Sequence, residues 1–247
     1  MRSADIGALE EARAHNLRDV LYGTRRVAVP IRVSFLQIRG TPPEPGPLAE
    51  IVRKRYHHAL DLYLLILAAT PVAPHRLFVN PDFWATLVRR PLQSRRAARL
   101  ALSRSLEVLG SLDLVKRETR LGVPLIQLLE ESGGGELYTH PAERGQRYIT
   151  LPHQYWEEGF DRTLDLPGKA VLLLARSLRP RGFTLPLAHA KEWYGISADT
   201  LRRGMNELVQ ARLVRYSASD VPAPKAPRGT TVRRLYTLAG AMARSAS

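Results

Sequence analysis

Apolar and polar residues alternate along the chain in patterns that predict short helices and strands. Near the N-terminus, a loose apolar stripe with helical spacing predicts a helix over residues 3–22. Residues 27–38 are rich in β-branched side chains and alternate in polarity, as strands do. The proline-rich segment 40–47 then predicts a linker, so we expect the first 47 residues to form an N-terminal arm.

Beyond this arm, the pattern runs through a similar series of elements twice. Asn80 followed by Pro81 predicts a helix start, Ser94 and Ser197 are further N-caps, and Gly195 predicts a tight turn. The first series comprises helices over 49–69, 81–89 and 95–110, the last ending at Gly110, and strands over 112–118 and 123–129. The second series comprises a strand over 147–151, helices over 165–178, 186–193 and 198–210, a strand over 213–217, an extended loop over 220–229 and a strand over 231–238.

Two stretches that lie 99 positions apart align without a gap, residues 102–116 on residues 201–215. Each has the pattern of a helix that leads into a short strand with a basic end. Such self-similarity indicates that one structural module is duplicated. We therefore expect an α+β fold, mainly α with small antiparallel β hairpins. In it, two winged helix-turn-helix domains, over 48–146 and 147–247, follow the arm over 1–47.

The net charge favours a polyanionic partner. The 247 residues include 37 Lys and Arg against 23 Asp and Glu, a formal net charge of +14. Residues 89–117 and 202–234 each hold eight basic and two acidic side chains, whereas residues 1–50 hold seven and six. A solvated face is the usual fate of a charge run, but two matched clusters in two matched modules favour nucleic acid. Arginine dominates, and its planar guanidinium suits bidentate contacts with phosphate or guanine.

Other classes of function lack the residues they need. The chain has no cysteine, which excludes disulfides, thiolate zinc sites and thiol nucleophiles. No apolar run approaches the ~20 residues of a membrane span, and no signal-peptide pattern is present. We expect a cytoplasmic, nucleoid-associated protein without a membrane partner. The run 133–135 of three glycines precedes no phosphate-binding lysine, and the glutamate pairs at 130–131 and 157–158 are typical of solvated loops. We expect no enzyme activity, metal or cofactor.

The helix over 198–210 has the clearest pattern of a DNA-reading element. Its apolar residues form one stripe, which leaves polar residues on the other side. Arginine pairs with guanine and asparagine with adenine through two hydrogen bonds each. Gly204 costs ~1 kcal/mol in mid-helix and indicates either a close backbone approach or neutral packing. The candidate DNA-binding residues here are Ser197, Asp199, Thr200, Arg202, Arg203 and Asn206, followed by Lys225, Arg228, Arg233 and Arg234 in a basic segment that is either a wing or a solvated loop.

The matching helix of the first module presents arginine and hydroxyl side chains, which suit phosphates as well as bases. Its candidate DNA-binding residues are Ser94, Arg95, Arg96, Arg99 and Ser103. The turn that precedes it is longer than the turn in the second module. We therefore expect the second module to be the main base reader, and the first to bind DNA, to form a homodimer, or to do both.

Residues 194–214, Tyr-Gly-Ile-Ser-Ala-Asp-Thr-Leu-Arg-Arg-Gly-Met-Asn-Glu-Leu-Val-Gln-Ala-Arg-Leu-Val, resemble the turn, recognition helix and first wing strand of bacterial regulators. Over residues 48–240 the chain resembles tandem winged-helix DNA-binding proteins, among them plasmid replication initiators. The resemblance implies sequence-specific binding of double-stranded DNA by a transcriptional regulator or mobile-element control protein. A replication initiator that binds origin repeats is the alternative, and a winged-helix scaffold that binds other proteins is a third hypothesis.

Overall fold

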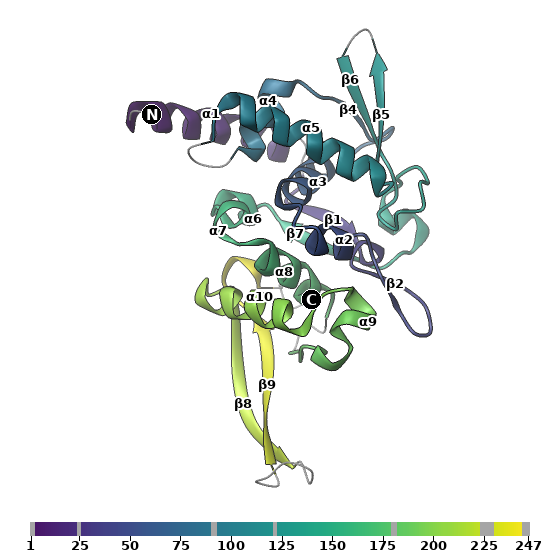
Figure 1. The fold of residues 1–247 in the computed structure, drawn as a ribbon, viewed down its shortest axis with the longest axis vertical. Helices are drawn as coiled ribbons and strands as arrows, with labels where there is room; N and C mark the ends of the chain where they lie inside the picture. The colour runs from purple at the N-terminus through teal and green to yellow at the C-terminus, as the bar shows by residue number, and fades with distance from the viewer. Residues whose placement is uncertain are drawn as a thin grey trace.

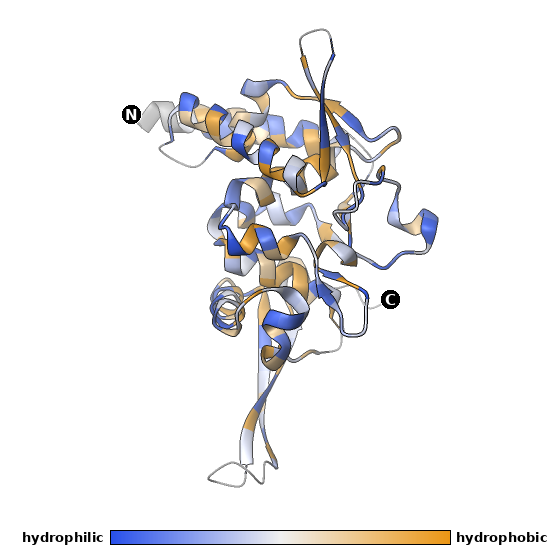
Figure 2. Cartoon of the chain, turned by 45° about the vertical axis from the view of Figure 1, so that its right-hand side comes forward, coloured by the Kyte–Doolittle hydropathy of each residue, from blue (hydrophilic) through white to orange (hydrophobic). Residues whose placement is uncertain are grey.

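The computed structural model describes residues 3–23, 26–89, 93–120, 123–178, 182–222 and 230–243. About 50% of it is helical and 23% is strand, in small antiparallel sheets. The chain is therefore of the α+β class, as the sequence predicts. Among the helices of these segments, none is both long and apolar enough to cross a membrane. Apolar residues concentrate where the helices pack together, and outward-facing turns are hydrophilic (Figure 2).

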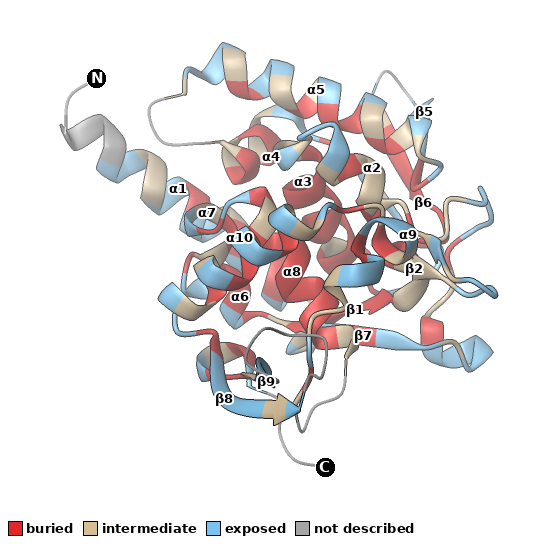
Figure 3. Ribbon diagram, turned by 60° about the horizontal axis from the view of Figure 1, so that its bottom comes forward, coloured by how far each residue is buried: buried red, intermediate tan, exposed pale blue. Residues whose placement is uncertain are grey.

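A two-stranded sheet and two buried helices form the centre of the molecule. Strand β1 (Ala28–Arg32) pairs antiparallel with β7 (Tyr148–Pro152), which places Ile31 opposite Ile149. Residues 28–32 of the predicted N-terminal arm are therefore packed into the body of the protein by this pairing. Helices α3 (His57–Ala69) and α8 (Leu166–Ser177) are buried along most of their length (Figure 3). Both helices carry continuous apolar runs, and a helix that is apolar on all sides is stable only when it is buried in this way.

The first unit, from α3 to β6, contains the elements of the first predicted series together with one extra strand. Asn80 caps α4 by accepting from the backbone NH groups of Asp82 and Phe83, and Ser94 caps α5 by accepting from that of Ala97, as predicted. The sheet order is β4-β6-β5, and its short edge strand β4 was not predicted. The unit comprises α3, β4 (Arg76–Phe78), α4 (Pro81–Val88), α5 (Arg95–Ser111), β5 (Val115–Arg120) and β6 (Val123–Leu128).

The second unit, from α8 to β9, repeats this order. A single antiparallel bridge between Phe183 and Tyr236 takes the place of the edge strand beside β9. Gly195 has a φ of +61° in the turn before α10, and Ser197 caps α10 by accepting from the NH of Thr200, both as predicted. The unit comprises α8, the short helix α9 (Ala190–Tyr194), α10 (Ala198–Gln210), β8 (Val214–Pro222) and β9 (Thr230–Leu238).

The 99-residue offset of the sequence repeat holds for individual hydrogen bonds. The NH of Leu114 donates to Leu109 O at 3.0 Å, and the NH of Leu213 donates to Leu208 O at 2.9 Å. Asp113 and Arg212, the residue before each leucine, both adopt a positive φ, 50° and 59°. The left-handed residue ends the helix and redirects the chain into a strand. Helices α5 and α10 therefore occupy equivalent positions in the two units.

Three predicted boundaries were wrong. The helix expected over 49–69 is two helices, α2 (Leu48–Arg53) and α3, separated by a left-handed corner at Arg55 (φ 58°) that neither proline nor glycine announces. Gly110 lies inside α5, which ends at Ser111 before the left-handed Asp113. The segment 27–38 is not one strand: after β1 come a 3-10 turn, η1 (Val33–Phe35), and the short β2 (Gln37–Ile38), which pairs with β3 (Glu44–Pro45).

Buried ion pairs connect segments that are far apart in the chain. Lys169 of α8 is 1% exposed and binds the carboxylate of Asp61 in α3, so the pair connects the central helices of the two units. Arg13 of α1 (Ser3–Tyr22) binds Asp161 of α7 (Phe160–Thr163), whose pKa burial raises to about 6. Helix α7 follows α6 (Gln154–Glu157), which begins just after β7. These pairs and a shared apolar core fix the two units relative to each other.

A third buried pair corrects the expectation that residues 130–131 are solvated loop charges. The Glu131 side chain is fully buried, and its carboxylate accepts hydrogen bonds from the backbone NH and the guanidinium of Arg32. The Arg32 guanidinium also lies 4.8 Å from the centre of the Tyr138 ring. Burial raises the pKa of Glu131. The glycine-rich loop is thereby fastened to the end of β1.

Gly204 allows α10 to cross α8 at close range. A Cβ added at Gly204 would lie 2.3 Å from the carbonyl oxygen of Pro167, so of the two explanations open from the sequence, close backbone approach is the correct one. We predict that Gly204→Ala destabilises the fold by about 1–3 kcal/mol, because backbone atoms would have to move. Gly110→Ala is the matched control. Its Cβ would meet nothing closer than 3.9 Å, so helix propensity should stabilise the protein by about 0.5–1 kcal/mol. Urea unfolding of both variants measures the difference, and equal effects would contradict the packing explanation.

Candidate nucleic-acid interface

Helix α10 has one buried and one exposed side. Leu201, Met205 and Leu208 are at most 1% exposed and pack into the core, whereas Arg202 and Asn206 face solvent. This division follows from the i, i+4, i+7 spacing of the apolar residues. The side that the sequence assigns to DNA is therefore free to meet a ligand.

The polar side chains at the start of α10 are held by local contacts. The Oγ of Ser197 lies 2.9 Å from Oγ1 of Thr200, and Asp199 Oδ1 accepts from Nη1 of Arg202 at 2.7 Å. Nη2 of Arg203 is 3.5 Å from the Thr200 hydroxyl, a long and weak contact. Asp199 therefore orients Arg202, and the guanidinium of Arg203 keeps most of its donors free for a ligand.

Two other polar groups near this helix are structural. Glu207 turns toward the start of α8, where its Oε1 accepts from the backbone NH of Asp165 at 2.5 Å. Burial raises the pKa of Glu207, and the backbone donors counteract part of that rise. Burial also raises the pKa of Tyr194, which lies in the turn before α10. The cap that Glu207 supplies to α8 is invisible in the sequence, because it is formed across 42 positions.

The β8–β9 hairpin carries the basic candidates of the predicted wing. Arg233 and Arg234 are exposed, and they pair in register with Ser219 and Ala218 of the opposite strand. The Arg234 guanidinium lies 5.2 Å from the ring centre of Tyr216. The other two candidates, Lys225 and Arg228, lie outside the described residues. The strands extend further than predicted, and the hairpin projects from the body at one end of the molecule (Figure 1).

The exposed side of α5 is less free than that of α10. Arg95 and Arg99 both bind the carboxylate of Asp82 in α4, with Nη2–Oδ2 distances of 2.8 and 2.5 Å. Hydrogen bonds from the two arginines lower the pKa of Asp82, and Asp82 raises the pKa of Arg95. Arg96 is exposed and forms no ion pair with any described residue. Sequence reasoning missed Asp82, because nothing in the spacing indicates that α4 delivers a carboxylate to this surface.

The two hydroxyl candidates of the first unit have local roles. Ser94 is used as the N-cap of α5. Ser103 is half-buried, and its Oγ lies 3.5 Å from Oε1 of Glu107 one turn later. The exposed arginines of α5 that form no ion pair with a described residue are therefore Arg96 and Arg104, and the two paired arginines stay half or more exposed at their side chains.

Helices α5 and α10 lie on the same side of the β1–β7 pair (Figures 1 and 3). The hairpins β5–β6 and β8–β9 extend to opposite ends of the long axis (Figure 1). The structure thus brings the helical candidates of each unit together on one helix, places Arg233 and Arg234 on β9, and sets the two helices on a common side. Helix α2, with the basic run 53–55, lies between them in both views. Sequence reasoning overlooked this run, although Arg-Lys-Arg was visible as a cluster.

The described parts of the chain hold no group of three or more His, Cys, Asp or Glu that could bind a metal ion. The aromatic side chains of Trp84, Tyr155 and Trp156 are core residues, while Trp193 is partly exposed and stacks on His189. What the arrangement offers chemically is positive charge and hydrogen-bond donors on a rigid support. In comparisons with known proteins, no family model, curated protein or solved structure matches the chain.

Proposed function

We propose that the chain is a sequence-specific binder of double-stranded DNA and that each unit is a winged helix-turn-helix. One observation carries the proposal: the repeat presents two exposed, arginine-bearing helices, α5 and α10, at equivalent positions and on the same side of the molecule. An α-helix fits the major groove of B-DNA, and arginine and asparagine are the side chains that read guanine and adenine there. A net charge of +14 supports the same class of ligand.

In this proposal α10 is the principal base reader. Arg202 is held by Asp199 on the helix itself, which limits its rotamers and favours one contact geometry. Asn206 lies one turn further along the same exposed side. Helix α5 contributes mainly phosphate contacts, because its candidates are arginine and serine, which suit phosphates as well as bases, and it presents no asparagine to read adenine. The hairpins would contact the duplex backbone on either side.

The proposed biological role is control of transcription or of a mobile element. A replication initiator is the second candidate, and the observation that favours it is the presence of two reading units in one chain, which suits repeated sites. Because one chain carries both units, DNA binding needs no second copy; a homodimer remains a prediction from the sequence. Cognate repeats in selected DNA would favour the initiator, and a single palindrome would favour the regulator.

The experiment that tests the proposal starts from duplexes selected from a random pool and measures the affinity of a double variant for them. Arg202→Ala with Arg203→Ala should weaken specific binding by about 2–6 kcal/mol, since each arginine–base contact contributes about 1–3 kcal/mol. Fluorescence anisotropy at fixed salt gives the dissociation constants. The same variant should lose its preference for the selected sequence over a scrambled duplex.

The matched control removes the same amount of charge elsewhere. Arg144, in the 3-10 turn η2 (Pro141–Arg144), and Arg147 precede β7 and belong to neither α5 nor α10. Arg144→Ala with Arg147→Ala should leave affinity within about threefold of the unmodified protein, because only long-range electrostatics change. If the Arg202 and Arg203 variant binds as tightly as this control, the protein-binding scaffold becomes the better hypothesis.

A further inference from the structure

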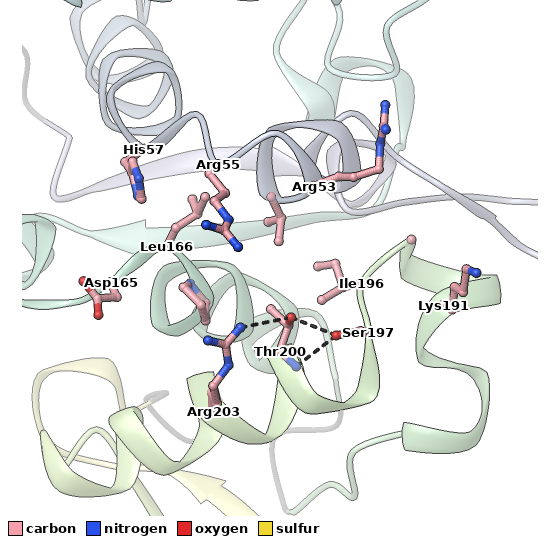
Figure 4. Close-up of a pocket in the computed structure, with 13 residues that line it drawn as sticks. Arg53, Arg55, His57, Asp165, Leu166, Lys191, Ile196, Ser197, Thr200 and Arg203 are labelled. Carbon is pink, nitrogen blue, oxygen red and sulfur yellow. Dashed lines mark hydrogen bonds between the residues drawn. The ribbon is translucent and has the colours of Figure 1, made fainter.

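A pocket of about 660 Å³ lies between the α2–α3 corner and the start of α10. Its walls come from segments of both units: residues 52–57 on one side, and residues 165–167 and 195–203 on the other. Gly195 sets the distance between them, since a Cβ there would lie only 2.6 Å from the Cβ of Ala49. The pocket is therefore a built feature of the joint between the units (Figure 4).

Three cations from three different elements line this pocket. Arg55 follows α2, Lys191 belongs to α9 and Arg203 belongs to α10, and all three are exposed. None of them forms an ion pair with a carboxylate of the described chain. Arg55 and Arg203 extend toward one another across the opening in Figure 4. Arg55 and Arg203 are like charges that face each other without a counter-ion, whereas Lys191 lies at the far edge of the pocket (Figure 4). Like charges placed in this way repel each other, so an anion between the two guanidinium groups stabilises the arrangement.

The other charged residues of the pocket do not cancel this excess. Arg53 is bound by Glu50, one turn earlier on α2, at 2.6 Å. Among the residues that line the pocket, Asp165 supplies a carboxylate, and it lies at the edge opposite to Lys191 (Figure 4). One carboxylate against three unpaired cations leaves the site positive.

The backbone at Arg55 supports a functional role for its side chain. Arg55 has a φ of 58°, and the NH of Tyr56 donates to Ile51 O at 2.9 Å to close the end of α2. Glycine is the residue that helices favour at such a left-handed position, and a side chain there is strained. An arginine at this corner accepts that strain while directing its guanidinium into the pocket (Figure 4).

The pocket also lies where a duplex bound by both α5 and α10 would pass. Helix α2 lies between α5 and α10 on the side that both helices share (Figures 1 and 3). A duplex that contacts both helices must pass over this region. The group that such a duplex presents between two reading helices is its sugar–phosphate backbone.

We propose that this pocket binds a backbone phosphate of the duplex between Arg55 and Arg203, with Lys191 adding positive charge at the far edge. The inference rests on the proposed function and extends it, because it adds the α2 corner, which is not among the DNA-binding residues predicted from the sequence. Its role is to position the duplex: a phosphate contact fixes register without reading sequence. It acts together with α10 through Arg203, which belongs to both sites.

The test is a scan of the selected duplex with single, uncharged methylphosphonate linkages. For the unmodified protein, one linkage between the two blocks of selected bases should weaken binding about tenfold, as expected for a lost charge-assisted hydrogen bond. Arg55→Gly should weaken binding by a similar factor for every sequence, and should make the plot of log K against log[salt] shallower by about 1. That variant should no longer respond to the sensitive linkage.

Arg55→Gly also separates affinity from folding. Glycine relieves the left-handed strain, so the melting temperature should equal or exceed that of the unmodified protein. Arg55→Ala keeps the left-handed strain. It should bind the duplex as weakly as Arg55→Gly does, but its melting temperature should be lower than that of Arg55→Gly.

The outcomes distinguish this inference from the proposed function. If Arg55→Gly binds the selected duplex with unchanged affinity and unchanged sensitivity to each linkage, the pocket does not hold a DNA phosphate, while sequence-specific binding stands. If inorganic phosphate binds to the protein in an Arg55-dependent manner but the duplex affinity of the variant is unchanged, a free anion is the ligand and the inference is wrong. If no duplex is selected at all, both proposals fall.

Discussion

Binding of the chain to its selected duplex should weaken by about 10³ to 10⁵ as monovalent salt rises from 50 to 200 mM, the range expected for about six to ten phosphate contacts. Each contact displaces condensed counterions from DNA, and the release becomes less favourable as bulk salt increases. The described surfaces supply enough cations for such a number. They are Arg95, Arg96 and Arg99 on α5, Arg202 and Arg203 on α10, Arg233 and Arg234 on β9, and Arg55 and Lys191 at the pocket.

The salt titration should be run on three proteins. Arg95→Ala with Arg96→Ala and Arg99→Ala should give a shallower slope with little change in sequence preference, because α5 contacts phosphates in this proposal. Arg144→Ala with Arg147→Ala should keep the slope of the unmodified protein. Affinity that does not change with salt would rule out the electrostatic mechanism for the whole chain.

Lys169→Met should lower the free energy of unfolding by about 3–5 kcal/mol, the cost of breaking a buried ion pair from one side. Lys169 and Asp61 are almost fully buried, and Asp161 lies near enough to both for its own pKa to respond to their charges. Removing the lysine leaves buried carboxylates with less positive charge to stabilise them. The melting temperature should fall by roughly 6–20 °C for a protein of this size.

Replacing both members of the Lys169–Asp61 pair tests whether the loss of stability comes from leaving one buried charge unpaired. Lys169→Met with Asp61→Leu removes both charges and should recover most of the lost stability, since apolar replacement of a complete buried pair is often neutral. Lys191→Met is the control for losing an exposed lysine, and should change stability by no more than about 0.5 kcal/mol. Equal stability of the Lys169 and Lys191 variants would mean that the α3–α8 pair does not hold the units together.

The local signals in the sequence predicted elements well where neighbours in the chain determine them. Ser197 and Asn80 cap the predicted helices, and the 99-residue repeat corresponds to two helices at equivalent positions, each followed by a left-handed residue. The left-handed corner at Arg55 was missed, because its stability comes from backbone hydrogen bonds and no glycine stands there. The edge strand β4 was missed because three residues carry too short a pattern.

The exposed residues of the candidate site could be predicted from the sequence, but their ion pairs and tertiary neighbours could not. Exposure of Arg202 and Asn206 follows from helical spacing, which the sequence displays. The ion pairs of Asp82 with Arg95 and Arg99 depend on how α4 packs beside α5, and the approach of Arg55 to Arg203 depends on how α2 packs against the start of α10. Both are consequences of tertiary packing between segments that the sequence pattern treats separately.

The proposed mode of DNA binding requires that α5 and α10 of one chain contact the same duplex. Hydroxyl-radical footprinting of the protein on its selected duplex measures this most directly. Two protected blocks on one face of the duplex are expected, with Arg202→Ala and Arg203→Ala weakening one block and Arg95→Ala, Arg96→Ala and Arg99→Ala weakening the other. A single block that depends on α10 alone, at protein concentrations where one chain is bound per duplex, would contradict it.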